Sequence, residues 1–387
     1  MEWTIIGGGI QGCTLACYLV EKGNVSPENI LIIDPHPSPM ENWKHCTGKI
    51  GMTYLRSPFV HHLSPSPFSL DHYASSEKYA SPFTGRQKKP RLDLFNNHSS
   101  AQFTSLGLEA SWKQGRVSGV KKQNGAWQLA LDSGEIVTTQ HTVIAIGLGE
   151  QPFWPDWARE IKNHRPRSIF HVFDSGCNPA NLRGPVTVIG GGITAAHLSL
   201  HLSKIQSNPV TMIHRHPFRI HEFDSDPGWM GQKHMGPFQK VKNLDKRRRM
   251  IRVARHKGSI PRHLYRSLKH AEKNRQVTLL SMNTTTVSEN SRGSLVLSDE
   301  NIHHETENVI LATGFEQKPP GMDWLAPLIQ DENLQCARCG YPAVPDSLEW
   351  CDHLYVTGGL AELALGPAAR NISGARRGAQ RIVDLHC

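Results

Sequence analysis

The stretch IIGGGIQGC at residues 5–13 decides the fold. It completes an apolar strand, and an apolar helix pattern follows it at residues 15–20. A second apolar strand at residues 30–33 then ends on Asp34. A strand, a glycine turn, a helix, a second strand and a terminal acid, in this order, form the unit that binds a dinucleotide at the helix N-terminus. The sequence therefore predicts that the chain begins with a parallel α/β nucleotide-binding domain.

Four residues of this unit have positions that suit contact with a dinucleotide. Gly7 permits the tight turn, and Gly9 lets backbone N–H groups approach a pyrophosphate. Gly12 allows the helix to pack closely on the strand. Asp34 can accept hydrogen bonds from ribose hydroxyls. We expect all four to belong to the first cofactor site.

The same signature occurs a second time as VTVIGGGITAA at residues 186–196, followed by a helix pattern and a strand at residues 210–213. Gly190 and Gly192 take the places of the first two glycines, and Ala195 takes the third, a substitution that this turn tolerates. The chain therefore carries two dinucleotide sites, and these three residues are candidates for the second one.

The two copies differ where their second strands end. The first copy ends on Asp34, whereas the second has His214 and Arg215 at the matching place. A carboxylate would repel a ribose 2′-phosphate, and a guanidinium pairs with it. We therefore expect FAD in the first site and NADPH in the second. The alternative is that Arg215 faces solvent and that NADH is used.

Further segments are placed to approach the cofactors. Apolar strands lead to Gly147 and to Thr313 and Gly314, where the chain must pass close to a cofactor. Near the C-terminus, a strand at residues 354–359 leads into a helix predicted over residues 360–370. The N-terminus of that helix, at Gly359 and Leu360, would direct its positive dipole end at a flavin.

The fold class follows from these elements: α/β, with two Rossmann-like dinucleotide-binding domains. The NADP(H) domain is expected to be inserted in a discontinuous FAD domain. The predicted boundaries are residues 1–183 and 318–387 for FAD and 184–317 for NADP(H). Turn signals favour a β-meander at residues 117–140, inserted in the first domain, and Val117 at its start is included among the FAD contacts.

Length and composition limit the number of domains, the cellular location and the state of the cysteines. The 387 residues allow two or three domains. No apolar run is long enough to span a bilayer, and no signal peptide is evident, so we expect a cytoplasmic protein without a membrane span. Eight cysteines in so long a chain are too few for a disulfide scaffold, and reduced thiols are expected. They lie at positions 13, 17, 46, 177, 336, 339, 351 and 387.

With these motifs placed, the chain resembles the flavin-dependent N-hydroxylating monooxygenases that act on the side-chain amine of lysine or ornithine. Three segments carry the resemblance. An acid followed by Leu-Ala-Thr-Gly-Phe lies at residues 307–315, with prolines at 319–320. Residues 52–58, with 90–95 downstream, resemble the stretch beneath the flavin in that family, and residues 362–370 resemble its C-terminal helix.

The resemblance implies that NADPH reduces FAD, that reduced flavin captures O2 as a C4a-hydroperoxide, and that a nucleophilic nitrogen of a small molecule, or less often a sulfur, is oxygenated. Such chemistry needs no catalytic triad, because the protein binds the cofactors and excludes water. Arg56, His61 and His62 are the candidates for touching substrate; contact with cofactor or local hydrogen bonding is the alternative for all three.

Two further patterns have competing interpretations. Cys336 and Cys339 form a CxxC that could be a redox dithiol, could join Cys351 and His353 in a zinc site, or could be plain loop thiols. A basic run at residues 246–249, continued by Arg252, Arg255 and Lys257, favours a solvated helix face over nucleic-acid binding, because no nucleic-acid-binding module surrounds it. Reinforcement of the NADP phosphate site or attraction of substrate is the second interpretation of this run.

The chain is thus predicted to be an FAD- and NADPH-dependent oxidoreductase, a monooxygenase acting on a small molecule and O2, without a nucleic-acid partner and with homo-oligomerisation possible. One alternative is an NAD(P)H-dependent reductase or oxidase that acts on a disulfide, a quinone or a protein. The other is a non-catalytic flavin-binding sensor.

Overall fold

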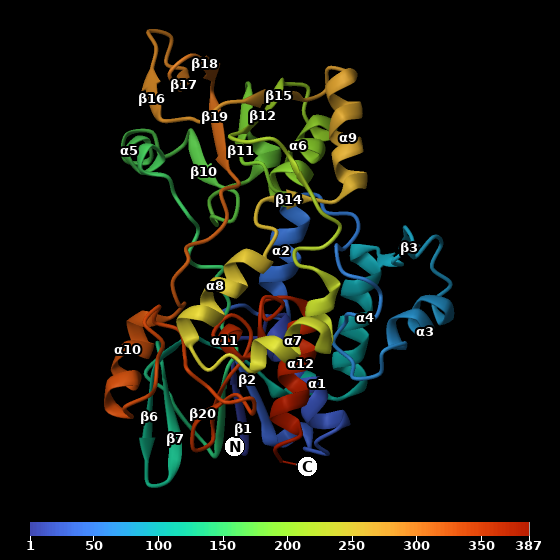
Figure 1. Ribbon diagram of the computed structural model, residues 1–387, viewed down its shortest axis with the longest axis vertical. Coiled ribbons are helices and arrows are strands. Elements are labelled where there is room, and N and C mark those ends of the chain that lie inside the picture. The colour runs from blue at the N-terminus through green and yellow to red at the C-terminus, as the bar shows by residue number, and fades with distance from the viewer. Residues whose placement is uncertain (387) are drawn as a thin grey trace.

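The computed structural model describes residues 1–386, so Cys387 lies outside the described residues. The chain forms two lobes, and Figure 1 shows both termini in the lower one. Each lobe contains a parallel sheet, and each of the two sheets includes the strands of one glycine signature. The predicted α/β class with two nucleotide-binding units is confirmed.

The lower lobe contains a six-stranded sheet in the order β20-β21-β9-β1-β2-β5. Its strands are parallel except β20, which pairs antiparallel with β21. They are β1 Trp3–Ile6, β2 Ile30–Asp34, β5 Trp112–Gln114, β9 His141–Ile144, β20 Glu349–Cys351 and β21 Leu354–Val356. Helices α1 (Ile10–Glu21) and α12 (Ile372–Val383) pack against each other, so the two ends of the chain share one core (Figure 1).

The upper lobe contains a five-stranded, wholly parallel sheet in the order β10-β19-β11-β12-β15. Its strands are β10 Ile169–His171, β11 Val186–Ile189, β12 Val210–His214, β15 Thr278–Ser281 and β19 Asn308–Leu311. Helices α6 (Ile193–Ile205) and α9 (Arg262–Lys273) pack side by side against it.

The predicted boundary between residues 183 and 184 is wrong. Strand β10 pairs in parallel with β19, and α5 (Asp156–His164) packs on β10. Residues 156–171 therefore belong to the upper lobe, although they precede the second glycine signature. A three-residue strand is too short to show periodicity, so no local pattern indicates that it joins the second sheet.

In both lobes a β-meander directly precedes a parallel strand that pairs with the strand leading into the glycine turn: β9 with β1, and β19 with β11. The predicted one is confirmed as β6 (Val117–Gln123), β7 (Ala126–Leu131) and β8 (Ile136–Thr139). A second one, which the sequence analysis missed, consists of β16 (Thr286–Glu289), β17 (Leu295–Ser298) and β18 (His303–Thr306). The two lobes thus repeat the same order of elements, from glycine turn to meander to central strand.

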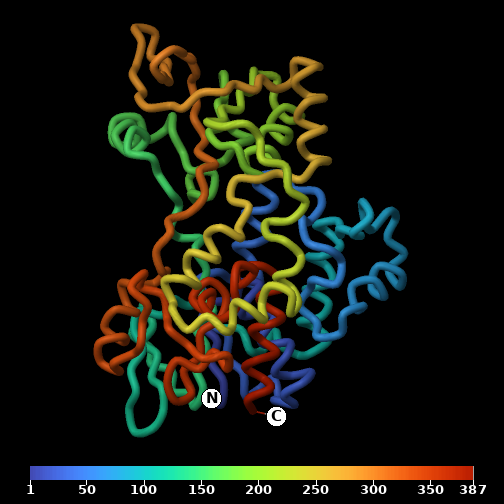
Figure 2. The backbone as a smooth tube through the Cα atoms, in the orientation of Figure 1, coloured from blue at the N-terminus to red at the C-terminus, as the bar shows by residue number. Residues whose placement is uncertain are grey.

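Two helices inside the predicted NADP(H) domain lie on the lower lobe instead. In Figure 2 the yellow stretch of the chain, with α7 (Gln232–Gln239) and α8 (Leu244–Ala254), crosses in front of the red C-terminal segment. Phe238 and Ile251 share a core cluster with Tyr341 and Leu363. The inserted region therefore packs on both lobes.

The helix predicted over residues 360–370 is wrong in extent. Helix α11 covers Glu362–Leu365 alone, a single turn. Gly366 has a φ of +78°, which ends the helix, and Pro367 follows it and lacks an N–H. The next helix, α12, begins at Ile372.

The remaining helices, strands and turns lie on the surface or between the lobes. They are α2 Glu41–Lys49, α3 Ser69–Ser76, α4 Leu92–Ser105, α10 Met322–Asp331, β3 Phe83–Thr84, β4 Lys89–Pro90, β13 Arg219–Ile220, β14 Ser259–Ile260 and four 3-10 turns at Pro27–Asn29, Leu108–Ser111, Pro179–Asn181 and Pro227–Met230. Within residues 1–386, no helix combines the length and apolar character needed to cross a membrane.

Candidate active site

The first glycine turn forms an open cradle at the N-terminus of α1. A Cβ built on Gly12 would lie 1.9 Å from the carbonyl oxygen of Gly7, so only glycine lets this helix pack on β1. A Cβ built on Gly9 would meet no described atom within 4 Å. The first-turn N–H groups of a helix have no acceptor within the helix. The open space at Gly9 and these donors fit a dinucleotide pyrophosphate.

Asp34 lies at the end of β2 beside this turn. Its Oδ2 accepts a hydrogen bond from the N–H of Gly8 at 2.6 Å, and its Oδ1 accepts one from the N–H of His36 at 2.9 Å. The carboxylate has further lone pairs, and 13% of the side chain is exposed, so it can still accept from a ribose. Sequence reasoning missed Trp112, whose ring lies against Gly8 and whose Nε1–H donates to the carbonyl of His36.

The second turn has the same construction. Gly190 has a φ of +152°, and a Cβ there would lie 2.6 Å from the carbonyl oxygen of Ala312. Ala195 is fully buried between helix and sheet, as expected for the third position. Gly192 lies opposite Gly258, whose Cα would be 3.4 Å from an added Cβ. A segment far along the chain therefore borders the second turn.

His214 and Arg215 lie where β12 ends. The His214 ring packs 4.3 Å from the ring of Phe218, and its Nδ1 lies 3.0 Å from the carbonyl of His216. Arg215 is exposed, and no hydrogen bond or ion pair ties it to another residue of the described chain. Its guanidinium is therefore available to an anion at the edge of the second site.

Three cofactor candidates, Thr313, Gly314 and Gly147, lie where the chain crosses between the lobes. The hydroxyl of Thr313 donates to the carbonyl of Phe153, and the N–H of Phe153 donates to the carbonyl of Gly314 at 2.8 Å. These bonds tie the two crossing segments together. Gly147 is open, with no described atom within 4 Å of an added Cβ.

The other three cofactor candidates have different surroundings. Val117 is 6% exposed and pairs with Leu131, so its backbone is the part that could reach an adenine. Leu360 is fully buried, and Gly359 lies against the Arg370 guanidinium. The expected helix dipole at residues 359–360 is wrong, because a single helical turn carries little of it.

Arg56 bridges the two lobes rather than facing an open site. Its guanidinium donates to the carbonyls of His221 (2.7 Å) and Glu222 (3.0 Å) and to the hydroxyl of Ser259 (2.9 Å). Lys89, which sequence reasoning missed, is 3% exposed and pairs with the Glu222 carboxylate at 2.8 Å. Both cations therefore hold the 221–222 segment of the upper lobe against the lower lobe.

His61 and His62 are adjacent in the chain but differ in burial and in contacts. His62 is fully buried, its carbonyl accepts from Arg376 at 3.0 Å, and its Nε2 lies 3.2 Å from the carbonyl of Pro67. It cannot contact a substrate, so that expectation is wrong. The His61 ring is partly exposed and lies among Asp224 and Arg376. Burial, and after it the Arg376 charge, lowers the pKa of His61 to about 4, so its imidazole is neutral at pH 7.

The expected solvated basic run is wrong for Arg248 and Arg255, because both pair with a buried carboxylate. Glu362 is fully buried and forms ion pairs with Arg248, with Arg255 at 2.7 Å and with Arg370 at 2.9 Å. These charges hold the pKa of Glu362 at about 2 despite its burial. Arg247 also turns inward and donates to the carbonyl of Leu363 at 3.0 Å.

The outward side of helix α8 is exposed, as expected for a solvated helix face. Lys246 and Arg249 are exposed and line an open groove of about 710 Å³ between α7 and α8, together with Trp229, His234 and Met250. Arg252 and Lys257 are exposed as well.

The cysteine loop does not assemble the suggested zinc site. Among the described residues, no group of three or more histidine, cysteine, aspartate or glutamate side chains is placed to hold a metal ion. The Cys339 sulfur instead accepts a hydrogen bond from Arg248 at 3.3 Å, and Cys336 is exposed. The four suggested ligands, Cys336, Cys339, Cys351 and His353, therefore do not meet.

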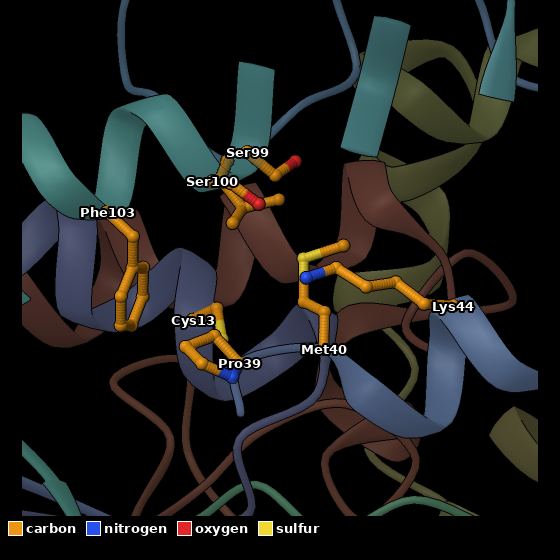
Figure 3. A pocket seen from close by; sticks show the side chains of 8 residues that line it. Cys13, Pro39, Met40, Lys44, Ser99, Ser100 and Phe103 are labelled. Carbon is orange, nitrogen blue, oxygen red and sulfur yellow. The ribbon is translucent and has the colours of Figure 1, made fainter. Parts of the chain in front are cut away.

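A small cavity lies below the first turn. Figure 3 shows it between Cys13 of α1, Met40 and Lys44 at the start of α2, and Ser99 and Ser100 of α4. Its volume is about 10 Å³, which is room for one water molecule at most. It is therefore too small for a substrate, which has to bind elsewhere.

The comparisons with known proteins agree with this geometry. A family model for FAD-NAD(P)-binding matches residues 4–149, and the model of L-lysine 6-monooxygenase/L-ornithine 5-monooxygenase matches residues 115–317. The chain belongs to this monooxygenase family. The predicted family is thereby confirmed, and so are the enzyme class and its cofactors FAD and NADPH. No curated protein matches the sequence.

Solved structures share the whole architecture. An ornithine N-hydroxylase of Kutzneria sp. 744 has a TM-score of 0.78 at 15% identity, over 100% of this chain and 98% of that one. The cadaverine monooxygenase of Erwinia amylovora has 0.76 at 17%, over 97% and 92%. L-lysine 6-monooxygenase of Pseudomonas syringae has 0.74 at 18%, over 100% and 98%. The chain is thus a flavin-dependent monooxygenase that oxygenates a nitrogen of a small molecule.

Proposed function

We propose that this monooxygenase N-hydroxylates a short aliphatic molecule that ends in a primary amine. The similar structures are named for acting on ornithine, lysine and cadaverine. Cadaverine has no carboxylate, so the feature that the three share is the primary amine at the end of an alkyl chain. The family model carries the same two amino acids in its description.

The observation that carries the proposal is the position of His61, whose partly exposed ring lies near Asp224 and Arg376. His61 follows residues 52–58, the segment expected beneath the flavin, and lies near the Asp224 carboxylate of the inserted region, with a neutral imidazole. An amine attacks oxygen through its lone pair, so a bound ammonium must first lose a proton. A neutral imidazole accepts a hydrogen bond from the uncharged amine and offers no positive charge to repel an ammonium that arrives.

The surroundings of His61 also favour the uncharged amine. Burial and the nearby Arg376 guanidinium lower the pKa of His61. The same two effects lower the pKa of an ammonium bound at this place, because both disfavour a positive charge. Asp224 acts in the opposite direction and would attract the ammonium on arrival. We assign a substrate-orienting role to His61 and a role in attracting the amine to Asp224.

The cofactor residues have separate roles in this proposal. The first-turn N–H groups of α1 would hold the FAD pyrophosphate, and Asp34 its ribose. Arg215 would pair with the 2′-phosphate of NADPH. Reduced FAD, when bound, supplies the activated oxygen from O2. Arg56 and Lys89 hold the 221–222 segment of the upper lobe against the lower lobe.

The test is the coupling between NADPH consumption and product. The FAD-loaded enzyme is given NADPH, O2 and one compound from a panel of cadaverine, ornithine, lysine and N-acetylcysteine, and hydroxylamine and NADPH oxidation are measured together. We expect hydroxylamine with at least one amine and none with the thiol. NADPH oxidation without hydroxylamine for every amine would refute the proposed substrate class.

Two expectations from the sequence stay predictions. They are a cytoplasmic location and the formation of a homo-oligomer. The mass of the purified enzyme in solution measures the second directly.

A further inference from the structure

The loop that carries Cys336 and Cys339 is a tight hairpin. The N–H of Ala337 donates to the carbonyl of Tyr341 at 2.9 Å, and the N–H of Gly340 donates to the carbonyl of Ala337 at 2.8 Å. Cys336 forms an antiparallel bridge with Pro342. Cys339 thus lies within the turn and Cys336 in the arm that leads into it. This backbone places both cysteines at one end of a hairpin.

Cys339 has a cation beside its sulfur. Arg248 of α8 donates from Nε to the Cys339 Sγ at 3.3 Å, and its guanidinium lies 4.1 Å above the ring of Tyr341. The ion pair with Glu362 fixes the guanidinium there. A guanidinium next to a thiol stabilises the thiolate, which is the reactive form of cysteine.

The same arginine has one buried donor left over. Its Nη2 is buried and has no hydrogen-bond partner among the described residues. An oxygen atom added to the Cys339 sulfur would offer an acceptor next to this guanidinium. The arginine can therefore stabilise both the thiolate before oxidation and the oxidised sulfur after it.

Cys336 is suited to the second step. It is exposed, and burial together with the charge on Cys339 raises its pKa. The two cysteines lie three residues apart in one hairpin, and the charge on Cys339 acts on Cys336. A reactive thiolate with an accessible neighbouring thiol is the arrangement of a peroxide-sensing pair.

The other cysteines that the structure describes lack this combination. Burial raises the pKa of Cys13, Cys17 and Cys177. Cys351 is half-buried, and burial with nearby carboxylates raises its pKa to about 11. Cys46 is half-buried and accepts no hydrogen bond from an arginine of the described chain, and burial raises its pKa too.

We propose that Cys339 and Cys336 are a peroxide-reactive dithiol. The Cys339 thiolate attacks one oxygen of H2O2, the O–O bond breaks, and hydroxide leaves, which gives the sulfenic acid. The Cys336 thiol then attacks that sulfur, the S–O bond breaks, and water leaves as the disulfide forms. In sum, two thiols and one H2O2 give one disulfide and two waters, with two electrons passed to the peroxide.

The oxidant can come from the enzyme itself. NADPH, a proton and O2 give NADP⁺ and H2O2 whenever a turnover does not oxygenate a substrate. The pair therefore lies on the protein that generates its oxidant. This proposal does not depend on which amine is the substrate.

The experiment uses the full-length, FAD-loaded enzyme, reduced with a thiol that is then removed and treated with H2O2. Peptide mapping is expected to find the Cys336–Cys339 peptide lighter by two hydrogens. In Cys336→Ser, a dimedone adduct is expected on Cys339. Cys351→Ser is the matched control and should keep the disulfide. FAD absorbance checks that each variant is folded.

Two results would overturn the proposal. The first is wild-type enzyme in which the pair stays reduced while other thiols oxidise. The second is a Cys339 that reacts with peroxide no faster than Cys351, because we expect a difference of at least about tenfold from thiolate stabilisation. A Cys336→Ser variant without the dimedone adduct would also contradict the assignment of Cys339 as the reacting thiolate.

Discussion

Replacing Glu362 with glutamine should destabilise the enzyme strongly. Glu362 is fully buried, and Arg248, Arg255 and Arg370 all direct guanidinium groups at its carboxylate. Glutamine keeps the shape of the side chain but removes its charge. Three neighbouring cations then lose the anion that neutralises them. Removal of one partner from a buried ion pair costs about 3–5 kcal/mol.

The pKa shift of Glu362 gives a second value for the loss in the free energy of unfolding. The three arginines, acting against burial, lower the pKa of Glu362 from 4.5 to about 2. At 1.36 kcal/mol per pKa unit this corresponds to about 3 kcal/mol in the free energy of unfolding. For a lobe of roughly 200 residues, about 2–4 °C per kcal/mol predicts that Tm falls by about 6–12 °C.

The pH dependence follows from the direction of the shift. Because the folded-state pKa lies below the unfolded one, the stabilisation is fully present above about pH 4.5 and is lost as the pH falls towards 2. The Tm difference between wild type and Glu362→Gln should therefore be constant between pH 6 and 8 and shrink below pH 4.5.

Thermal melts of the FAD-loaded protein, followed by tryptophan fluorescence, measure both effects. Glu300→Gln is the matched control, because Glu300 is exposed in a loop and should change Tm by less than about 1 °C. The reasoning is refuted if Glu362→Gln melts like the control at pH 7, or if its deficit does not diminish in acid.

Three other perturbations test the cofactor and substrate assignments. Arg215→Ala should raise the KM for NADPH about 10–100-fold, because a charge-assisted hydrogen bond contributes about that factor to binding. The KM for NADH should stay almost unchanged. An unaltered preference for NADPH over NADH in steady-state kinetics would disprove the phosphate contact. Gly12→Ala should abolish FAD loading, because its Cβ would lie 1.9 Å from a carbonyl, whereas Gly48→Ala in α2, with free space, should load FAD normally. His61→Ala should lower kcat/KM for the amine and leave anaerobic flavin reduction by NADPH unchanged, and the wild-type pH profile should show no His61 titration between pH 6 and 8, because its pKa is about 4.

Local sequence determined what could be predicted of the fold. The glycine turns, their strands and the first meander depend on residues that are neighbours in the chain, and the periodicity of each segment is visible on its own. Strand β10 was missed because its three residues carry no pattern, and its partner β19 comes some 140 residues later. The second meander resembles the first in structure, but its strands of four residues each are short.

The misjudged site residues share one physical cause. Whether a polar side chain faces solvent depends on segments that fold against it from elsewhere in the chain. His61 and His62 are adjacent, yet the second is fully buried, because its carbonyl accepts from Arg376 of α12 and its ring lies against the carbonyl of Pro67. From its own sequence, the basic helix α8 is expected to face solvent. Its Arg248 is instead paired with Glu362, which lies more than a hundred residues later in the chain.

The same long-range contacts explain how the two cofactors are brought together. Besides apolar packing, cations that bind backbone carbonyls and a carboxylate join the lobes across the gap. Arg56 and Lys89 do this on one side, and the pairing of Phe153 with Gly314 ties the crossing segments. Hydride transfer needs the nicotinamide and the flavin at contact distance, and a small displacement is costly. Directional hydrogen bonds fix such a distance more closely than an apolar interface does, so loss of the Arg56 guanidinium should slow flavin reduction even though Arg56 contacts no cofactor in this scheme.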